Sequence, residues 1–556
     1  MQQKFLEKTL GQQIADMAAK YPDDNMIDYT DRDYSRTWKE FNDECETIAR
    51  GFMALGLKKG SHISIWGTNV PAWLLTFFGS AKMGGILVTV NTSYKVFELD
   101  YQLKQSDSEA IVLIDGYKGT SYIDIINELC PELESCEPGK LKSRRLPLLK
   151  SVIYAGEGEC PAGMVDWKEL YTLAEKTPIE EFEAVRDSCD CHEVVNIQYT
   201  SGTTGFPKGV MLTHYNILNN GQTIGDGMKF THEDRLCITV PFFHCFGMVL
   251  ALMSCISHGT PFVPIDMFNA KKVMDALATK HCTAVHGVPT MFIAMLEHPD
   301  FDKYDFSHMR TGIMAGSPCP IKTMYDVSEK MNMRDIVIVF GQTEAAPGCT
   351  MTTTEDSLET RCATVGKAFP GVECKIVDPN TGETLPAGEI GEFCARGYNI
   401  MKGYYKMPEA TAQAIDKDGW LHFGDLAVCD ENGYYKVTGR LKDMIIRGGE
   451  NIYPKELEEC LYHNDRVKDV QVIGVPSKKY GEEVCACVIL KEGEDMTEDE
   501  IKAYYKENVA FFKIPKYVWI MDEFPMTASG KIQKFVLRDM AVEKYSLQSD
   551  DSIETA

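Results

Sequence analysis

The stretch Tyr199–Val210 reads YTSGTTGFPKGV and decides how the first part of the chain is interpreted. Its centre, Ser201–Gly209, contains three glycines, three hydroxyl side chains and one lysine. A loop of this composition can wrap backbone N–H groups around phosphate oxygens, while the hydroxyl and ammonium groups add charge-assisted hydrogen bonds. The flanking segments Val194–Thr200 and Val210–Leu212 are both strand-like. The pattern therefore predicts a phosphate-binding loop between two strands.

This loop differs from the Walker A loop of nucleotide hydrolases. A Walker A loop places a glycine directly before its lysine and opens a helix, whereas here Pro207 precedes Lys208 and a strand follows. A flexible surface hairpin is the alternative interpretation of a loop rich in Gly, Ser and Thr. Further motifs along the chain decide between the two.

Short apolar runs recur through the first two-thirds of the chain, with helix-like stretches between several of them. The runs are Ile63–Trp66, Ile86–Val90, Ala110–Ile114, Ala284–Gly287 and Ile336–Phe340. Buried strands that alternate with helices are typical of an α/β fold with largely parallel sheets. From Val365 to Arg440, turn signals separate short strands, which predicts a β-rich subdomain.

The last part of the chain again mixes strands and helices. Val470–Val475 and Glu482–Leu490 alternate as strands do, and Thr497 with Glu500 forms a capping box that begins a helix. The tail is polar and acidic, as disordered segments are. We therefore expect a large N-terminal domain over residues 1–440, with its β-rich subdomain at about 365–440, a small, mobile α+β domain over 441–545, and a disordered tail over 546–556.

Composition excludes some classes of function. The net charge is −25 and the pI is about 5.0, which argues against a nucleic-acid or anionic-membrane binder. The 19 cysteines are dispersed without a C-x-x-C pair, which fits reduced thiols in a cytosol. This spacing offers only weak support for a metal site. Cys485 and Cys487 share one face of a predicted strand, so we expect both in a core.

No membrane-spanning or signal segment is evident in the sequence. The most apolar window, Ile238–Ile256, is interrupted by Pro241, His244 and Gly247, which favours a buried strand, loop and helix. The N-terminus moves directly into a helix-like pattern, Leu10–Ala19, without an apolar signal region. We therefore expect a cytoplasmic protein.

The full loop string resembles the signature loop of the adenylate-forming superfamily, which includes acyl-CoA synthetases, 4-coumarate–CoA ligases, firefly luciferase and peptide-synthetase adenylation domains. Further motifs of the superfamily follow in its order over nearly the whole chain. The resemblance implies an enzyme that transfers AMP from ATP to a carboxylic acid. It assigns ATP contacts in the loop to Thr200, Ser201, Gly202, Thr203, Thr204, Gly205 and Lys208, and a metal contact to Thr203.

A second motif, Phe340–Glu344 (FGQTE), follows an apolar strand, where ligands of α/β sheets bind. The resemblance implies that the Phe340 ring stacks on adenine, that Thr343 touches the α-phosphate, and that Glu344 holds Mg²⁺. The superfamily usually has tyrosine at position 340, so a hydroxyl contact is lost while stacking survives. The remaining nucleotide contacts implied here are Gly316, Ser317, Pro318, Gly341 and Gln342.

A third motif, Trp420–Asp425 (WLHFGD), is similar to the ribose-binding segment of the superfamily. The resemblance implies that Asp425 accepts hydrogen bonds from the ribose hydroxyls and that Arg440 also reaches the ribose. Phe423 stands where the superfamily has threonine, which puts any contact by that side chain in doubt. Read without the other motifs, Asp425 and Arg440 would be an ordinary surface pair.

The C-terminal motifs resemble those of the superfamily's moving domain. Lys442 takes the place of the hinge, and Gly448, Gly449 and Glu450 take the place of the CoA tunnel. The segment PMTASGK matches the final motif, whose lysine, here Lys531, bridges the substrate carboxylate and the α-phosphate. These roles are implied by the resemblance.

The identity of the acid is addressed by Pro241–Gly247 (PFFHCFG), which contains no acidic residue. Amino-acid adenylation domains place an aspartate near here to pair with the α-amine, so an apolar chain or ring is favoured. His244 matches a catalytic gate of the superfamily, although a buried core histidine is the ordinary alternative. The expected acyl pocket consists of His244, Val285, Val288, Met314 and Ala315.

The acceptor is expected to be free CoA, because the chain ends too soon after Lys531 to hold a carrier-protein domain. The segment Phe524–Phe535 (FPMTASGKIQKF) looks most like medium-chain fatty acyl-CoA synthetases. We therefore expect a fatty acid–CoA ligase that uses ATP, Mg²⁺ and CoA. Three alternatives stay open: an aryl- or dicarboxylic-acid–CoA ligase, an acyl-adenylate donor to a separate carrier protein, and an inactive nucleotide-binding regulator. Assembly as a homodimer is also left open.

Overall fold

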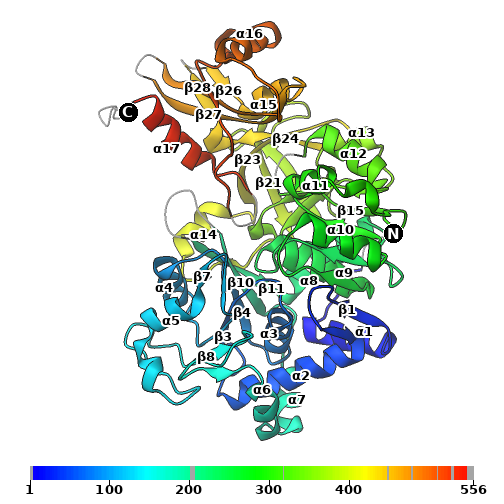
Figure 1. The fold of residues 1–556 in the computed structure, drawn as a ribbon, viewed down its shortest axis with the longest axis vertical. Helices are drawn as coiled ribbons and strands as arrows, with labels where there is room; N and C mark the ends of the chain where they lie inside the picture. Colours follow the sequence, from blue (N-terminus) through cyan, green and yellow to red (C-terminus); the bar gives the residue numbers. More distant parts are fainter. Residues whose placement is uncertain are drawn as a thin grey trace. The chain divides into compact units, whose positions relative to one another are not determined.

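The structure is a computed structural model that describes residues 4–200, 207–316, 319–447, 450–477, 480–509, 511–527 and 531–547. The chain divides into two compact units, Met1–Cys374 with Ala395–Leu421, and Lys375–Cys394 with His422–Ala556. Both units combine helices with sheets (Figure 1), so the predicted α/β class, with a large N-terminal and a small C-terminal domain, is confirmed. The domain boundary at Lys442 stays a prediction.

The first unit contains an eight-stranded sheet with the order β22-β11-β10-β4-β3-β5-β8-β9. In chain order its strands are β3 (His62–Trp66), β4 (Ile86–Thr89), β5 (Ala110–Leu113), β8 (Ser151–Tyr154), β9 (Val165–Asp166), β10 (Val194–Thr200), β11 (Lys208–Thr213) and β22 (Gly403–Tyr404). Strand β10 is parallel to β4 and antiparallel to β11. The phosphate loop thus joins two strands, as predicted, although residues 201–206 lie outside the described residues.

A seven-stranded sheet has the order β16-β15-β14-β12-β13-β1-β2, and its pairs are parallel except for β1 with β2. Its strands are β1 (Asn25–Asp28), β2 (Ser35–Thr37), β12 (Leu236–Ile238), β13 (Phe262–Pro264), β14 (Ala284–His286), β15 (Thr311–Ile313) and β16 (Asp335–Val337). Strands β12, β13, β14 and β15 are buried throughout, as expected for parallel strands with both faces covered. The predicted strands at 63–66, 86–90, 110–114 and 284–287 are therefore confirmed.

The apolar run Ile336–Phe340 is divided between two sheets, which corrects the expectation of one strand. Strand β16 ends at Val337, and β17 (Val339–Gly341) pairs with β18 (Gly348–Met351), which pairs with β19 (Lys367–Ala368). Between the sheets, the Ile338 N–H donates to Thr352 Oγ1 at 2.9 Å, and the Thr352 N–H donates to the Ile338 carbonyl at 3.0 Å. Thr352 thereby satisfies the backbone where the chain changes sheet.

Helices cover the sheets of the first unit. They are α1 (Leu10–Lys20), α2 (Trp38–Ala54), α3 (Pro71–Lys82), α4 (Val96–Gln105), α5 (Tyr122–Leu129), α6 (Glu169–Leu173), α7 (Ile179–Asp187), α8 (His214–Gly227), α9 (Ser254–His258), α10 (Ala270–Thr279), α11 (Pro289–Leu296), α12 (Ile321–Lys330), α13 (Leu358–Ala363) and α14 (Pro408–Ala414). Helix α1 begins at Leu10, as predicted, because Thr9 and Gln12 form a capping box.

The window Ile238–Ile256 is a buried strand end, loop and helix, as predicted. A π-helix, Phe246–Met253, runs into α9, and all eight of its residues are buried. Among the described residues, no helix has the length and apolar character that a membrane span needs.

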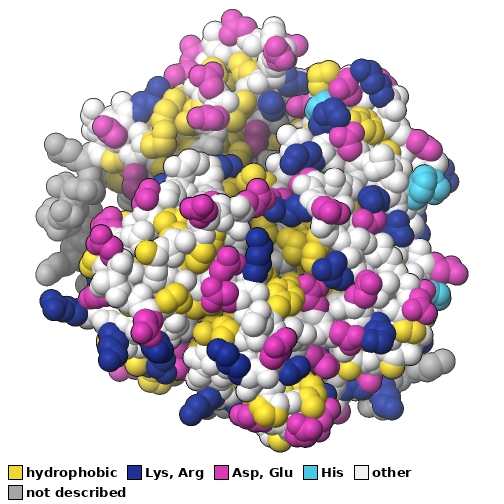
Figure 2. All heavy atoms as spheres, turned by 60° about the horizontal axis from the view of Figure 1, so that its bottom comes forward, with side chains coloured by type: hydrophobic (Ala, Val, Ile, Leu, Met, Phe, Trp, Pro, Cys, Tyr) yellow, Lys and Arg dark blue, Asp and Glu magenta, His cyan; other side chains and the backbone are white. Residues whose placement is uncertain are grey.

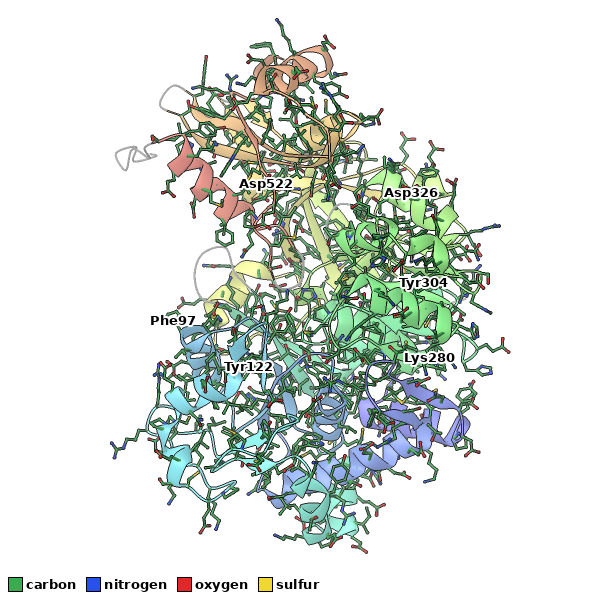
Figure 3. The ribbon with its side chains drawn as sticks, in the orientation of Figure 1. Phe97, Tyr122, Lys280, Tyr304, Asp326 and Asp522 are labelled. Carbon is green, nitrogen blue, oxygen red and sulfur yellow. The ribbon has the colours of Figure 1, made fainter. Side chains whose placement is uncertain are left out.

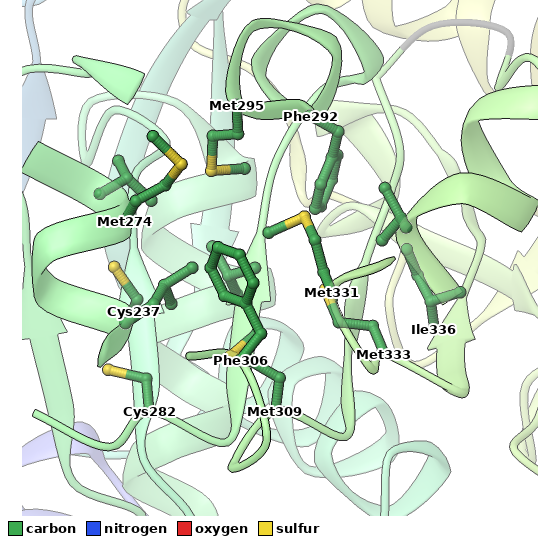
Figure 4. Close-up of a cluster of buried hydrophobic side chains, with 14 of the residues drawn as sticks. Cys237, Met274, Cys282, Phe292, Met295, Phe306, Met309, Met331, Met333 and Ile336 are labelled. Carbon is green, nitrogen blue, oxygen red and sulfur yellow. The ribbon is translucent and has the colours of Figure 1, made fainter. Parts of the chain in front are cut away.

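Two apolar contacts illustrate how the layers pack. The Tyr122 ring at the start of α5 (Figure 3) stacks on Trp66 at the end of β3, with 3.6 Å between ring centroids. Between the seven-stranded sheet and helices α10, α11 and α12 lies a core rich in methionine (Figure 4), which includes Met274, Met295, Met309, Met314, Met324, Met331 and Met333. Methionine side chains are flexible and fill irregular space between layers.

The second unit is built on strands of two sheets. One sheet has the order β20-β21-β23-β24, with β20 (Val372–Val377), β21 (Gly391–Gly397), β23 (Leu421–Cys429) and β24 (Tyr435–Arg440). The other pairs β26 (Glu450–Ile452), β25 (Ile445–Arg447), β28 (Gly481–Leu490), β27 (Val467–Ser477) and β29 (Tyr517–Ile520). Its helices are α15 (Pro454–Tyr462), α16 (Glu498–Asn508) and α17 (Lys534–Lys544).

Local predictions for this unit are confirmed. The predicted strands 470–475 and 482–490 lie within β27 and β28. Thr497 and Glu500 form the capping box of α16. Cys485 and Cys487 are both fully buried in one core cluster, as the alternation of the strand predicted. On the face of the molecule that Figure 2 shows, basic and acidic side chains are interspersed without a basic patch.

Asn69 connects the two parallel sheets of the first unit. Its Nδ2 donates to the carbonyls of Val240 and Ile265 at 3.0 and 3.1 Å, and its Oδ1 accepts the Phe242 N–H at 2.8 Å. The side chain is 2% exposed, so water cannot replace these bonds. Because Phe242 lies two residues before His244, Asn69 also fixes the backbone of a predicted site segment.

We expect Asn69→Ala to destabilise the protein by about 3 kcal/mol or more, because three buried backbone groups lose their partner at about 1 kcal/mol or more each. Chemical denaturation with urea measures the change. Asn380→Ala, in an exposed turn, is the matched control and should change stability by less than about 0.5 kcal/mol. Equal effects of the two substitutions would show that the Asn69 contacts contribute nothing specific.

Candidate active site

The two ends of the phosphate loop are placed by the β10–β11 pair. Thr200, the last residue of β10, lies opposite Lys208, the first residue of β11. A Cβ on Gly209 would lie 2.9 Å from the Ile197 side chain, so glycine permits the close pairing. The hydroxyl of Thr200 and the ammonium of Lys208 therefore flank the loop. The predicted contacts Ser201, Gly202, Thr203, Thr204 and Gly205 lie outside the described residues.

Glu344 presents a buried carboxylate beside this loop. Its Oε1 accepts a hydrogen bond from the Tyr404 hydroxyl at 2.8 Å and a longer one from Thr200 Oγ1 at 3.5 Å. The Lys208 ammonium lies 4.9 Å from the centroid of the Tyr404 ring. In the part of the chain that the structure describes, Glu344 makes no ion pair with Lys, Arg or His. A buried carboxylate without a cationic partner fits a ligand of a hard divalent cation such as Mg²⁺.

Tyr404 is a site residue that the sequence motifs did not reveal. Burial, with Glu344 as a further cause, raises the pKa of Tyr404 well above its usual value, so the phenol stays a donor. Strand β22 positions it, because Tyr404 pairs with Val210 of β11. Tyr404 and its strand partner Val210 are about 190 residues apart in the sequence, so no local motif indicates that they pair.

Thr343 and His244 are brought together through Cys245. The Cys245 sulfur lies 3.5 Å from Thr343 Oγ1 and 3.7 Å from His244 Nδ1. His244 Nδ1 accepts the Phe246 N–H at 3.2 Å, which places the proton of a neutral imidazole on Nε2. Two predicted catalytic residues, 99 positions apart, thus share one contact region.

The predicted acyl-pocket residues converge at the ends of neighbouring strands. Gly287 forms an isolated parallel bridge with Met314, and the Ala315 N–H donates to the Gly287 carbonyl at 3.3 Å. A Cβ on Gly316 would lie 3.1 Å from the Val288 side chain. Met314 and Val285 are fully buried in the methionine-rich core. The structure therefore brings Val285, Val288, Met314 and Ala315 together at neighbouring strand ends.

His286 lies in the same region and was missed by sequence reasoning. It is fully buried at the end of β14, and its Nδ1 accepts the Ile313 N–H at 3.3 Å. Burial lowers the pKa of His286 to about 4, so its imidazole is neutral at pH 7. Its ring centroid lies 6.2 Å from that of Phe246.

The backbone of the FGQTE motif requires glycine at position 341. Phe340 is half-buried in β17 and lies opposite Thr350. A Cβ on Gly341 would lie 1.8 Å from the Pro347 carbonyl, so only glycine fits there. The chain then passes Gln342 and enters the short helix Thr343–Ala345, where Thr343 and Glu344 are buried. Ser317 and Pro318, predicted on the other side of adenine, lie outside the described residues.

The predicted ribose contacts, Asp425 and Arg440, are a cross-strand pair of β23 and β24. Arg440 Nε lies 3.0 Å from Asp425 Oδ1. Asp425 is buried, and this burial raises its pKa, while the charges of Arg440, Lys531 and Lys442 oppose the rise. Lys531 therefore lies within electrostatic reach of the predicted ribose ligand in the second unit.

The packing of Phe423 accounts for phenylalanine at the position where the superfamily usually has threonine. Its side chain is 8% exposed and packs edge-on against Phe393, with 4.8 Å between ring centroids. It contributes to the core of the sheet instead of presenting a hydroxyl. Gly424 follows with φ of +66°, a left-handed turn of the backbone within β23 that glycine adopts without strain.

The remaining predicted residues are those proposed for the hinge and the CoA tunnel, and they lie in the second unit. Lys442 lies in the short helix Leu441–Asp443, and partial burial of its ammonium lowers its pKa. Gly448 and Gly449 lie outside the described residues, as does the side chain of Glu450. The assigned roles of all four residues stay predictions.

A separate cleft of about 460 Å³ opens in the first unit, at the carboxyl ends of β5 and β8. Its basic residues are already neutralised, because Arg32 pairs with Glu157 and Asp266, and Arg36 pairs with Glu44. Paired arginines offer little to a phosphate, so this cleft does not compete with the loop after Thr200 as the nucleotide site.

Comparison with known proteins agrees with this geometry. Residues 14–405 match the family described as AMP-binding enzyme, and residues 456–531 match its C-terminal domain. The chain is 51% identical over 546 residues to the Bacillus subtilis protein YngI, whose name gives acyl-CoA synthetase as a provisional activity; the match covers 98% of this chain and 99% of YngI. It is 39% identical over 545 residues to the mitochondrial medium-chain acyl-CoA ligase ACSF2 of Bos taurus, covering 97% and 88%. ATP-bound MatB from Rhodopseudomonas palustris has a TM-score of 0.83 at 28% identity, covering 97% of this chain and 100% of MatB.

We expect the free energy of unfolding to fall as the pH is lowered from about 6.5 to about 4. Burial lowers the pKa of both His214 and His286 to about 4, whereas unfolded histidine titrates near 6.5. In this window the unfolded chain binds more protons, so stability is lost as pH falls. Urea titrations at a series of pH values measure the slope.

Replacing His214 and His286 together by glutamine should flatten this slope, whatever its effect on stability at neutral pH. His192→Gln, at an exposed histidine, is the control and should leave the slope unchanged. An unchanged slope in the double variant would contradict the assignment of these two groups.

Proposed function

The chain belongs to the AMP-binding enzyme family and is an AMP-forming acid–CoA ligase, and we propose that the acid it activates is a medium-chain fatty acid. The observation that carries this proposal is the apolar character of the converging set Val285, Val288, Met314 and Ala315. Such a lining suits an aliphatic chain, whereas a second carboxylate would require a buried cation. The relative named as a medium-chain acyl-CoA ligase supports the same substrate class.

In the first half-reaction, a carboxylate oxygen of the acid attacks the α-phosphorus of ATP and pyrophosphate leaves. Both reactants are anions, so positive charge must offset their repulsion. We assign this role to Lys531 and to Lys208, at the end of the phosphate loop. Mg²⁺, held by Glu344 and Thr203, would supply further charge neutralisation at the phosphates when bound.

Positioning in this step falls to residues around the α-phosphate and the nucleoside. We assign the contact with the α-phosphate to Thr343, whose hydroxyl lies beside the Cys245 sulfur, and the contact with the acyl carboxylate to His244. Asp425 and Arg440 would hold the ribose. Because Asp425 and Arg440 are already paired, little reorganisation is needed when the nucleotide binds.

In the second half-reaction, the CoA thiol attacks the carbonyl of the acyl-adenylate and AMP leaves. We propose that the small domain turns at Lys442 between the two steps, which withdraws Lys531 and brings Gly448, Gly449 and Glu450 to the pantetheine. The cytoplasm is the proposed location of the enzyme.

The experiment that tests the substrate class is pyrophosphate release across a panel of acids. We expect the largest kcat/KM for saturated acids of intermediate chain length, with loss of activity for dicarboxylic acids because a second charge would be buried. CoA-dependent release of AMP should accompany it. A preference for aryl or dicarboxylic acids would overturn the medium-chain proposal. AMP release that does not depend on CoA would favour a separate carrier protein as the acceptor.

Lys531→Ala should lower the rate of acyl-adenylate formation by about 10²-fold or more, the effect of removing one key electrostatic group. It should largely spare thioester formation from preformed acyl-AMP, because Lys531 has withdrawn in that step. Single-turnover kinetics of each half-reaction measure the two effects. Lys506→Ala, at an exposed position of α16, is the matched control. Equal loss of both half-reactions would refute the assigned role.

A further inference from the structure

Three potential metal ligands of different chemistry meet on the face of one sheet. Glu392 and Cys394 are two residues apart on β21, so their side chains point to the same face, and His422 faces them from β23. One ligand atom from each of the three lies within 4.8 Å of the others. None of the three was singled out as a metal ligand by the sequence, because Cys394 belongs to no cysteine motif.

The distances are close to those of a tetrahedral site. Cys394 Sγ lies 3.5 Å from His422 Nδ1. A zinc ion with bonds of about 2.3 Å to sulfur and about 2.0 Å to nitrogen holds these atoms about 3.5 Å apart. Glu392 Oε2 lies 2.8 Å from the same nitrogen, so this pair must open by about half an ångström to admit an ion.

The ligand set selects a class of metal. A thiolate with an imidazole and a carboxylate suits Zn²⁺ and neighbouring transition metals, whereas Mg²⁺ takes oxygen ligands. The Mg²⁺ that accompanies ATP should therefore not compete for this site. His422 is about one-third exposed and Glu392 about one-eighth exposed at their side chains, which leaves room for water as a fourth ligand.

The cluster is connected to the strand that carries the proposed ribose ligand. Glu392 Oε1 accepts the Gly424 N–H at 3.0 Å, and Asp425 follows Gly424. The carboxylate could thus bind an ion through Oε2 while Oε1 remains on the backbone. Shifting Glu392 by half an ångström would then strain the turn that positions Asp425.

We propose that Glu392, Cys394 and His422 form a binding site for a zinc-class transition-metal ion, and that the bound ion weakens nucleotide binding through Gly424 and Asp425. On binding, the Cys394 thiol releases its proton to water, and the imidazole carries its remaining proton on Nε2. The nucleotide coupling rests on the proposed function of Asp425, whereas the metal site itself does not.

A second cluster offers a matched control. Glu7, Cys191 and His192 also lie within reach of one another, but the side chains of Glu7 and His192 are 67% and 61% exposed. Exposed side chains lose much of their conformational entropy when they become ligands of an ion. We therefore expect this cluster to bind metal ions weakly.

Cobalt(II) is the probe for the metal site, because a thiolate ligand gives a charge-transfer band that Mg²⁺ cannot produce. In the full-length protein with excess Mg²⁺, we expect a band that saturates at one Co²⁺ per chain. Cys394→Ser and His422→Gln should abolish it, and Cys191→Ser should retain it. A band absent from the natural protein, or kept in Cys394→Ser, would overturn the site.

Glu392→Gln keeps an acceptor for the Gly424 N–H and removes the charged ligand. This variant tests the metal site if the Cys394 variant does not fold. It should weaken Co²⁺ binding by about 10-fold or more. An unchanged affinity would count against the site in the same way.

Coupling is measured by AMP titrations with and without Zn²⁺. We expect Zn²⁺ to raise the Kd for AMP by about five-fold or more, and AMP to raise the Kd for Zn²⁺ by the same factor. Equal affinities would refute the coupling and leave the cobalt result standing. Metal binding by a protein that releases no pyrophosphate with any acid would contradict the proposed function alone.

Discussion

The buried carboxylate of Glu344 is the group on which the first part of the site depends. Without a cationic partner among the described residues, it must be held by hydrogen bonds, and Tyr404 supplies the shorter one at 2.8 Å. Tyr404 can do so only because β22 pairs with β11, the strand that leaves the phosphate loop. This hydrogen bond links the FGQTE motif to a strand about 60 residues further along the chain.

A different balance holds the proposed ribose site. Asp425 is also buried, but Arg440, Lys442 and Lys531 surround it electrostatically and oppose the rise of its pKa. The first carboxylate thus has hydrogen-bond partners without an ion pair among the described residues, whereas the second is paired with Arg440. The same residue chemistry serves two purposes because the neighbouring charges differ.

Much of the fold could be predicted from local patterns. The strand runs at 63–66 and 110–114 and the capping box at Thr497 depend on burial and on neighbouring residues, which the sequence contains. The run Ile336–Phe340 was predicted as one strand because apolar content alone does not show a change of sheet. That change depends on Thr352, whose hydroxyl satisfies Ile338 from outside the run.

The sequence by itself determined the family and supplied the residues proposed to contact the nucleotide, because contiguous strings such as YTSGTTGFPKGV and FGQTE carry both the residue types and their spacing. Only the tertiary structure decided which groups support them. Tyr404, His286 and Glu392 make hydrogen bonds to segments that are distant in sequence. Their burial and partners arise when sheets form, and no local pattern contains that information.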